Sequence, residues 1–302
     1  MKIVLTGSVG NIGEPLVKKL VKNRHTVTVI SSNPERIPAI EALGAEAAIG
    51  NMFDRDFLKS TFENAEIVYL METLEAVGSF FDKEKDFIGS IEKIGQNYFE
   101  AVKAAGIQKV IHLSSIGAHL EKENGILQFH YIVENILNKL PDTVSIKFMR
   151  PVGFYTNMYS LINTIKKTES IISNYGGNKK EPWVSPLDIA DVIAEEINKP
   201  FTGRTIRYIA SDEVSPNEIA DVLGKAIDQK DLKWIAIPDD QLLSNWLEIG
   251  FNEQIARGFV EMQNSQGTGL LYEDYYKHKP ILGKVKLTDF AEDFARLYCS
   301  ES

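Results

Sequence analysis

The stretch Thr6-Gly7-Ser8-Val9-Gly10-Asn11-Ile12-Gly13 directly follows an apolar run from Lys2 and precedes a segment with helical periodicity. Its three glycines permit, in order, a tight turn, close approach of the main chain to a phosphate, and close packing of a helix on a strand. The start of the next helix offers free N–H groups and partial positive charge to an anion. Because the turn joins a strand to a helix, it predicts a Rossmann fold that holds a cofactor pyrophosphate between Gly7 and Gly13.

Outward from this turn, short apolar β-branched runs alternate with helix-period stretches, which is typical of βαβ units on a parallel sheet. Their nearly continuous apolarity indicates burial on both faces. The predicted strands are Lys2 to Thr6, Thr26 to Ile30, Ala45 to Ile49, Ile67 to Met71, Lys109 to Leu113 and Ser145 to Met149. We therefore expect an α/β domain over residues 1–150 with a doubly wound parallel sheet.

After Pro151 the pattern loosens into helices, aromatic-rich loops and one further strand at Thr205 to Ile209. Two helix starts are well marked there, Ser185-Pro186 with Asp188 and Ser215-Pro216 with Glu218. Each places a cap, a proline in the first turn and an acid at the third position. We expect residues 151–302 to form a smaller, mostly helical substrate lobe on the carboxyl edge of the sheet, with segments returning to the Rossmann body.

The amino-acid composition and net charge indicate which kind of ligand the chain binds. The chain has 302 residues, 44% of them hydrophobic, and a formal net charge of −9. This charge argues against binding to nucleic acid or an anionic membrane and favours a small-molecule substrate. The single cysteine, Cys299, cannot build a disulfide framework within one chain, and no run reaches membrane-spanning length. A cytoplasmic protein without a metal site is expected.

The choice of cofactor is predicted from the end of the second strand, where an acid would bind the adenosine ribose diol. The segment there runs Ile30-Ser31-Ser32-Asn33-Pro34-Glu35-Arg36, with no acid at the strand end. Ser31, Ser32, Asn33 and Arg36 would accept a 2′-phosphate, which a guanidinium matches well. NADP(H) is therefore favoured, with NAD(H) possible. In the alternative interpretation, Asn33 only caps the helix begun by Pro34 and Arg36 lies on its solvated face.

Several further motifs give the chain a family resemblance. They are Gly50-Asn51-Met52 after the third strand, Val110-Ile111-His112-Leu113-Ser114-Ser115 on the fifth, His130-Tyr131-Ile132-Val133-Glu134 on the next helix, Arg150-Pro151-Val152-Gly153-Phe154-Tyr155-Thr156-Asn157-Met158 after the sixth, and Trp183-Val184-Ser185-Pro186-Leu187-Asp188-Ile189-Ala190-Asp191-Val192. With the glycine turn, they resemble the NmrA-like branch of the atypical short-chain dehydrogenase/reductases, most strongly before about Pro238.

The resemblance implies an NADP(H) site and two kinds of activity. Members of the branch include NADPH-dependent quinone and triphenylmethane-dye reductases, and also redox sensors that bind NADP without turnover. Besides the glycine turn and the second strand end, the residues expected at the cofactor are Asn51, Met52, Met71, Ser114, Pro151, Gly153 and Phe154. Asn51 stands where many relatives have aspartate near the adenine.

The chain lacks the catalytic tyrosine–lysine pair of short-chain dehydrogenases at its usual place. Short-chain dehydrogenases usually carry a Tyr-x-x-x-Lys pair on the helix after the fifth strand, whereas this helix has Tyr131 with Asn135 and His130 with Glu134. The pattern does occur at Tyr175 to Lys179 and at Tyr275 to Lys279. Neither pair follows the fifth strand, and we interpret both as chance.

The catalytic candidates are then Ser115, His130, Glu134 and Tyr155. Ser115 lies just beyond the fifth strand, or else caps the following turn. His130 and Glu134 share a helix face, and a histidine can move a proton near neutral pH. The alternative roles are a structural histidine and a glutamate that ties down a neighbouring loop. Tyr155, with Phe154 and Met158, would wall the nicotinamide pocket, whereas Trp183, Trp246 and Phe251 line a flat substrate site or belong to the core.

Two functions remain open from the sequence. The first is an NADPH-dependent reductase of quinone-like or other planar electrophilic compounds, which needs no strong general acid. The second is a non-catalytic NADP(H)-binding redox sensor that binds a protein partner, which the missing Tyr-Lys pair would permit.

Overall fold

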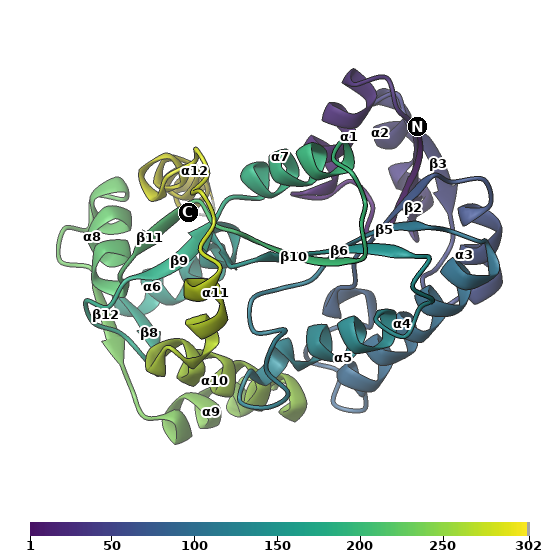
Figure 1. Cartoon of the computed structure of the whole chain (residues 1–302). Coiled ribbons are helices and arrows are strands. Elements are labelled where there is room, and N and C mark those ends of the chain that lie inside the picture. Colours follow the sequence, from purple (N-terminus) through teal and green to yellow (C-terminus); the bar gives the residue numbers. More distant parts are fainter. Residues whose placement is uncertain (301–302) are drawn as a thin grey trace.

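The computed structural model describes residues 1–300 and is built on one seven-stranded parallel sheet (Figure 1). Its strands are β1 (Lys2–Leu5), β2 (Thr26–Ser31), β3 (Glu46–Ile49), β4 (Ile67–Leu70), β5 (Lys109–Leu113), β6 (Ser145–Pro151) and β10 (Arg204–Ile209). Their order is β10-β6-β5-β4-β1-β2-β3, so the winding reverses between β1 and β4. Ligands bind outside the carboxyl ends of the strands at such a point. The predicted doubly wound Rossmann sheet is confirmed.

Helices cover both faces of this sheet (Figure 1). One face packs against α1 (Gly13–Lys22), α2 (Ile37–Ala42) and α7 (Pro186–Ile197), and the other against α3 (Arg55–Phe62), α4 (Phe87–Ala104) and α5 (Gln128–Leu137). In α4 the buried side chains Ile91, Ile94, Tyr98 and Ala101 recur at spacings of three and four, so a single helical face meets the sheet.

The strand at 204–209 has a larger role than the sequence indicated. It pairs in parallel with β6, from Arg204 opposite Ile146 to Ile209 opposite Pro151, and becomes the edge strand of the Rossmann sheet. Together with α7 it returns the chain from the second half to the first. The division at residue 150 stays a prediction.

The C-terminal region combines helices with two small sheets, whereas only a mostly helical lobe was expected. The helices are α6 (Ile162–Thr168), α8 (Pro216–Ala226), α9 (Asp239–Glu248), α10 (Glu253–Thr268), α11 (Glu273–Lys277) and α12 (Leu287–Ser300). One sheet contains β7 (Gly153–Phe154), β9 (Glu181–Val184) and β11 (Asp212–Val214), and the other β8 (Ser170–Ser173) and β12 (Lys233–Ala236). Short 3-10 turns lie at Pro34–Arg36, Leu74–Ala76, Gly125–Leu127, Tyr155–Leu161 and Leu270–Tyr272.

Both marked helix starts in this region are confirmed, with one difference. Ser215 and Glu218 form a full capping box at the start of α8. Ser185 caps α7, but the carboxylate of Asp188 turns away and accepts the N–H groups of Lys284 and Val285. Asp188 therefore anchors the segment before α12 to the Rossmann body. Within residues 1–300, none of the helices is both long and apolar enough to cross a membrane.

Candidate functional site

The three glycines of the turn after β1 differ in why a side chain would be unfavourable at each position. Gly7 has a φ of +91°, in the left-handed region, and a Cβ built on it would lie 2.1 Å from the sulfur of Met71. A Cβ on Gly13 would lie 2.1 Å from the carbonyl oxygen of Ser8, so this glycine permits α1 to pack closely. A Cβ on Gly10 would meet nothing within 4 Å. The fold itself does not require a glycine there, whereas a ligand approaching the main chain would.

The main-chain donors of this turn are free. The N–H groups of Val9, Gly10, Asn11 and Ile12 have no acceptor within residues 1–300, and no side chain caps the start of α1. Unpaired donors at the positive end of a helix are well suited to a phosphate group. The turn therefore offers main-chain donors that an anionic group could use.

At the end of β2 the predicted phosphate contacts divide into two groups. Ser31 is buried, accepts a hydrogen bond from the Ser8 hydroxyl at 3.1 Å and contacts the N–H of Asn33 at 3.3 Å. The side-chain amide oxygen of Asn33 accepts the N–H of Glu35 and so caps the turn begun by Pro34. Ser32 and Arg36 are exposed. The predicted contact of a 2′-phosphate with Ser32 and Arg36 stays a prediction.

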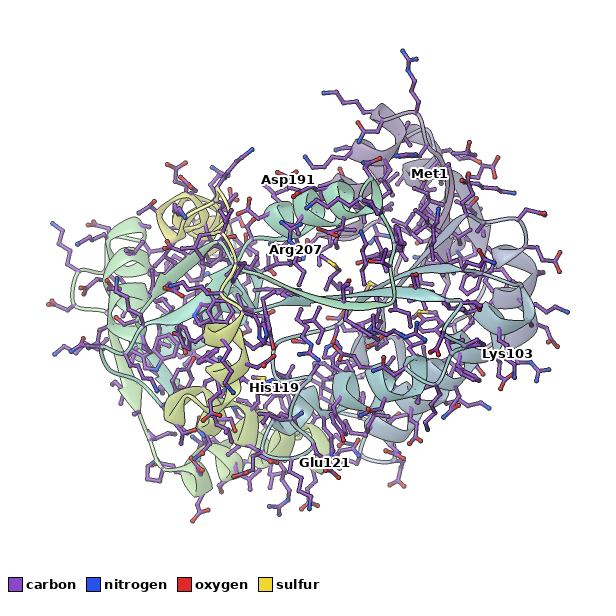
Figure 2. The ribbon with its side chains drawn as sticks, in the orientation of Figure 1. Met1, Lys103, His119, Glu121, Asp191 and Arg207 are labelled. Atoms are coloured by element: carbon purple, nitrogen blue, oxygen red, sulfur yellow. The ribbon has the colours of Figure 1, made fainter. Side chains whose placement is uncertain are left out.

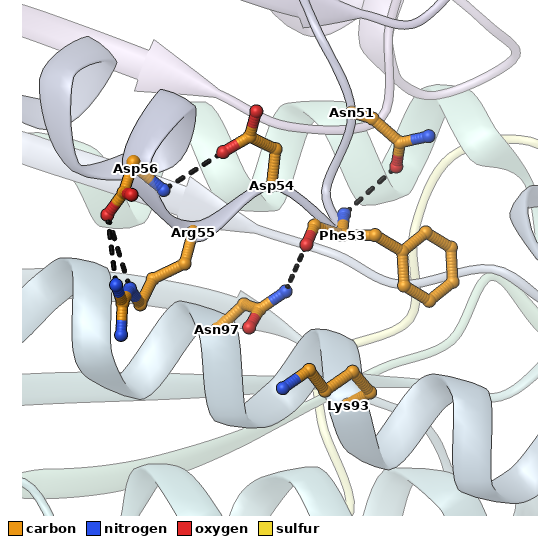
Figure 3. Close-up of a pocket in the computed structure, with 7 residues that line it drawn as sticks. All are labelled: Asn51, Phe53, Asp54, Arg55, Asp56, Lys93 and Asn97. Carbon is orange, nitrogen blue, oxygen red and sulfur yellow. Dashed lines mark hydrogen bonds and ion pairs between the residues drawn. The ribbon is translucent and has the colours of Figure 1, made fainter.

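Beyond β3 lies an open surface pocket of about 480 Å³ (Figure 3). It is lined by Asn51, Phe53, Asp54, Arg55, Asp56, Lys93 and Asn97. Asn97 of α4 donates from its amide to the carbonyl oxygen of Met52 at 3.1 Å and to that of Phe53 at 2.9 Å, and these bonds hold the loop after β3. Figure 3 shows the bond to Phe53. The sequence analysis missed Asn97, although an amide on the apolar face of α4 was a visible signal.

On the face of the sheet covered by α5, polar side chains form a row near the carboxyl ends of β4 to β6. His112 lies in β5, and Ser114 directly follows that strand. Because side chains two apart on a strand point the same way, both face α5. The Ser114 hydroxyl donates to Glu134 at 2.5 Å, and Arg150 of β6 donates to both carboxylate oxygens of Glu134, at 2.9 and 2.6 Å. Glu134 thus joins α5 to the sheet and not to a neighbouring loop.

Next to this pair, Glu72 bridges two histidines. Its carboxylate lies 3.0 Å from Nε2 of His112 and 3.1 Å from Nδ1 of His130, and its side chain is fully buried. Burial acts to raise the pKa of Glu72, but the charges and hydrogen bonds of the two imidazoles outweigh it and lower that pKa to about 2. The sequence analysis named neither Glu72 nor His112 as a site residue, because each lies in or beside a strand without a distinctive neighbour.

The other predicted site residues lie at different depths. Ser115 is half-buried, directly after Ser114. The carbonyl oxygen of Met71 accepts the Tyr98 hydroxyl, Pro151 is the last residue of β6, and Gly153 and Phe154 form β7. Tyr155 is 1% exposed and stacks on Phe290 in a separate core of the C-terminal region. Burial raises the pKa of its phenol, and the phenol oxygen has no partner within residues 1–300. Tyr155 is therefore not part of the polar row.

In both Tyr-x-x-x-Lys patterns outside α5, the tyrosine donates to a carboxylate. Tyr275 and Lys279 both donate to Glu213, and Tyr175 donates to Glu181. Burial, reinforced by the neighbouring carboxylate, raises the pKa of each tyrosine. This is the opposite of what proton transfer near neutral pH needs, which agrees with interpreting both patterns as chance. Trp183 belongs to the buried core, whereas Trp246 stacks on Phe251 beside the exposed Phe81.

Comparison with known proteins places this geometry in context. The model of the NmrA-like family matches residues 1–290. The NADPH-dependent quinone oxidoreductase QOR2 of Escherichia coli, solved with NADPH, superposes with a TM-score of 0.78 at 18% identity, covering 98% of this chain and 99% of that one. Triphenylmethane reductase of Citrobacter sp. gives a TM-score of 0.75 at 16% identity, covering 98% and 100%. At these identities the likeness shows the fold.

In sequence, sterol demethylase protein B of Methylococcus capsulatus is 25% identical over 134 residues, which are 44% of this chain. The matched region spans 40% of the length of that relative.

Proposed function

This chain belongs to the NmrA-like family, and from that premise we propose that it is an NADPH-dependent reductase of quinone-like or other planar electrophilic small molecules. The observation that carries the proposal is the glycine turn, where four successive N–H groups have no acceptor within residues 1–300 and a Cβ on Gly10 would meet nothing within 4 Å. The likeness to reductases of quinones and dyes extends over nearly the whole chain and supports the same class.

The cofactor proposed is NADP(H), with its pyrophosphate on the turn from Gly7 to Gly13. At the adenosine end, Ser32 and Arg36 are exposed beside a strand end without an acid, which favours a 2′-phosphate. Asn51 and Met52, which lie just after β3, are the residues proposed to contact the adenine. When bound, the cofactor supplies a hydride.

The remaining chemistry falls to residues near the carboxyl ends of β4 to β6. Reduction of a quinone to a hydroquinone consumes the hydride and one proton from solvent, so a group must stabilise or protonate the reduced oxygen. His130 is more exposed than the other titratable side chains of the polar row, at 11% of its side chain against 6% for Glu134 and 5% for Arg150. Glu134 is already committed to Arg150 and Ser114.

The test is an NADPH-oxidation screen of the purified protein against quinones, azo and triarylmethane dyes, aldehydes and enones. Turnover of a planar acceptor at least tenfold above background supports the proposal. Tight NADPH binding with no turnover of any acceptor would reject it in favour of the redox sensor. That alternative is favoured by one observation, that Asn135 and not a lysine lies four residues after Tyr131 on α5.

A further inference from the structure

We infer that Glu72 is a positioning residue for the proton donor His130, holding this histidine as the Nδ1–H tautomer so that Nε2 is left for the reduced acceptor. The inference rests on the proposed reductase function. It assigns a role to a buried His112–Glu72–His130 cluster that joins β5, the end of β4 and α5.

The tautomers follow from the charge of the carboxylate. An ionised carboxylate only accepts hydrogen bonds, so each imidazole nitrogen that faces Glu72 must carry a hydrogen. His130 presents Nδ1 to Oε1 at 3.1 Å, and His112 presents Nε2 to both oxygens, at 3.2 and 3.0 Å. His112 thereby fixes the orientation of the carboxylate, and Glu72 fixes that of His130.

Burial distinguishes the two histidines. The side chain of His112 is fully buried, and its Nδ1 has no partner within residues 1–300. A hydrogen on this nitrogen would be a buried donor without an acceptor, so His112 offers no second site for proton exchange. The His130 side chain keeps 11% exposure and its Nε2 makes no hydrogen bond in the described chain. His130 is the member of the cluster that can exchange a proton with solvent or an acceptor.

The charged and titratable neighbours leave this arrangement undisturbed. On α5, one turn beyond His130, Glu134 is neutralised by Arg150 of β6. Tyr69 of β4 and Tyr98 of α4 both have pKa values raised by burial, so they remain neutral. Glu72 is then the charged group in direct contact with Nδ1 of His130.

His130 supplies one proton in each turnover. Protonated His130 breaks its Nε2–H bond and transfers the proton to the oxygen that hydride transfer has reduced, and neutral His130 recovers a proton from water. Glu72 keeps its charge and its hydrogen bond to Nδ1 throughout. Such a carboxylate–histidine pair orients the ring and sets its tautomer.

The experiment measures ring nitrogen chemical shifts by NMR in the ¹⁵N-labelled full chain, which has five histidines. His130→Ala identifies the His130 signals. We compare the wild type with Glu72→Gln, with Glu72→Asp, and with Glu181→Gln, a control that removes an equally buried carboxylate from the C-terminal region. The same proteins are assayed for NADPH affinity by calorimetry and for the pH profile of kcat with an acceptor from the screen.

The expected wild-type result is the Nδ1–H tautomer of neutral His130. Glu72→Gln should lose that tautomer preference, lower kcat by about tenfold or more with KM for NADPH kept, and change the pH profile of kcat. Glu72→Asp should restore part of the rate, and Glu181→Gln should change none of these readouts.

An Nε2–H tautomer in the wild type, or a Glu72→Gln variant with an unchanged kcat profile, would overturn the inference. The wild-type tautomer needs no variant, so a misfolded Glu72→Gln protein leaves the test intact. Absence of NADPH binding or turnover defeats the proposed function, whereas the tautomer measurement decides the role of Glu72 by itself.

Discussion

Glu134 and Arg150 form a buried ion pair with two hydrogen bonds, and their side chains are 6% and 5% exposed. Glu134 lies four residues after His130 on α5, which is the spacing that separates tyrosine from lysine in the dehydrogenase pattern. In this chain Glu134, at that spacing from His130, links α5 to β6 through Arg150. Arg150 also contacts Asp274 of α11, 3.3 Å away, so the network reaches the C-terminal region. Figure 2 shows His119, whose nearest charges include Asp274 and Arg150, beside the same helix.

The first prediction is that Glu134→Gln lowers the free energy of unfolding by about 3 to 5 kcal/mol, because it leaves the charge of Arg150 buried without its partner. Urea unfolding measures this. Glu195→Gln is the control, since its ion pair with Arg207 is exposed and should contribute less than about 1 kcal/mol. Equal losses of unfolding free energy in the two variants would show that burial does not increase the cost of breaking the Glu134–Arg150 pair.

A second prediction concerns the adenosine end. Arg36→Ala should weaken NADPH binding by about tenfold, because an exposed charge-assisted contact to the 2′-phosphate is lost. Titration calorimetry with NADPH and NADH checks it, with NADH as the internal control that should not change. If NADH binds the wild type as tightly as NADPH does, the end of β2 does not select for phosphate.

The glycine turn supplies a third prediction with a matched pair. Gly10→Val should keep the fold, since its Cβ meets nothing, yet weaken NADPH binding by at least about a hundredfold by occupying the phosphate space. Gly13→Val should instead destabilise the protein by about 1 to 3 kcal/mol, because its Cβ would meet the Ser8 carbonyl. Calorimetry and thermal unfolding separate the effects. A folded Gly10→Val protein with normal affinity would remove the basis of the cofactor assignment.

How far the sequence predicts this molecule depends on the range of each interaction. The turn from Gly7 to Gly13, the strands before residue 150 and the cap at Ser215 are local patterns, and each lies where expected. The pairing of β10 with β6 joins residues almost 60 apart, and no local pattern encodes it. For the same reason, Glu72 became a site candidate only when the fold brought it to His130, 58 positions away.

A fourth prediction follows from Glu181. Burial raises its pKa from the ordinary 4.5 to about 7, although hydrogen bonds from Tyr272, Tyr175 and Trp183 act to lower it. Because the folded pKa lies above the unfolded one, this residue contributes stability that is fully present below about pH 4.5 and is lost as the pH rises through about 7. A shift of this size corresponds to about 3 kcal/mol.

The measurement is urea unfolding of the wild type and of Glu181→Gln at several pH values between 4.5 and 8. The variant should lose less stability across this window than the wild type. Glu195→Gln, which removes an exposed carboxylate, should keep the wild-type slope. Parallel curves for the wild type and Glu181→Gln would mean that Glu181 titrates alike in the folded and unfolded chains.

The last prediction ranks the two neighbouring candidates on α5. A positioned general acid contributes roughly 10² to 10⁴ in rate. His130 lies against the Glu72 carboxylate and retains some exposure, whereas Tyr131 has Asn135 and not a lysine one turn later. We therefore expect His130→Ala to lower kcat more than tenfold with NADPH affinity largely kept, and Tyr131→Phe to change it less than twofold. Steady-state kinetics with an acceptor from the screen decides between them. The reverse ranking would make tyrosine the acid, and full activity in both variants would mean that the protein acts by binding and orientation, with water as the proton source.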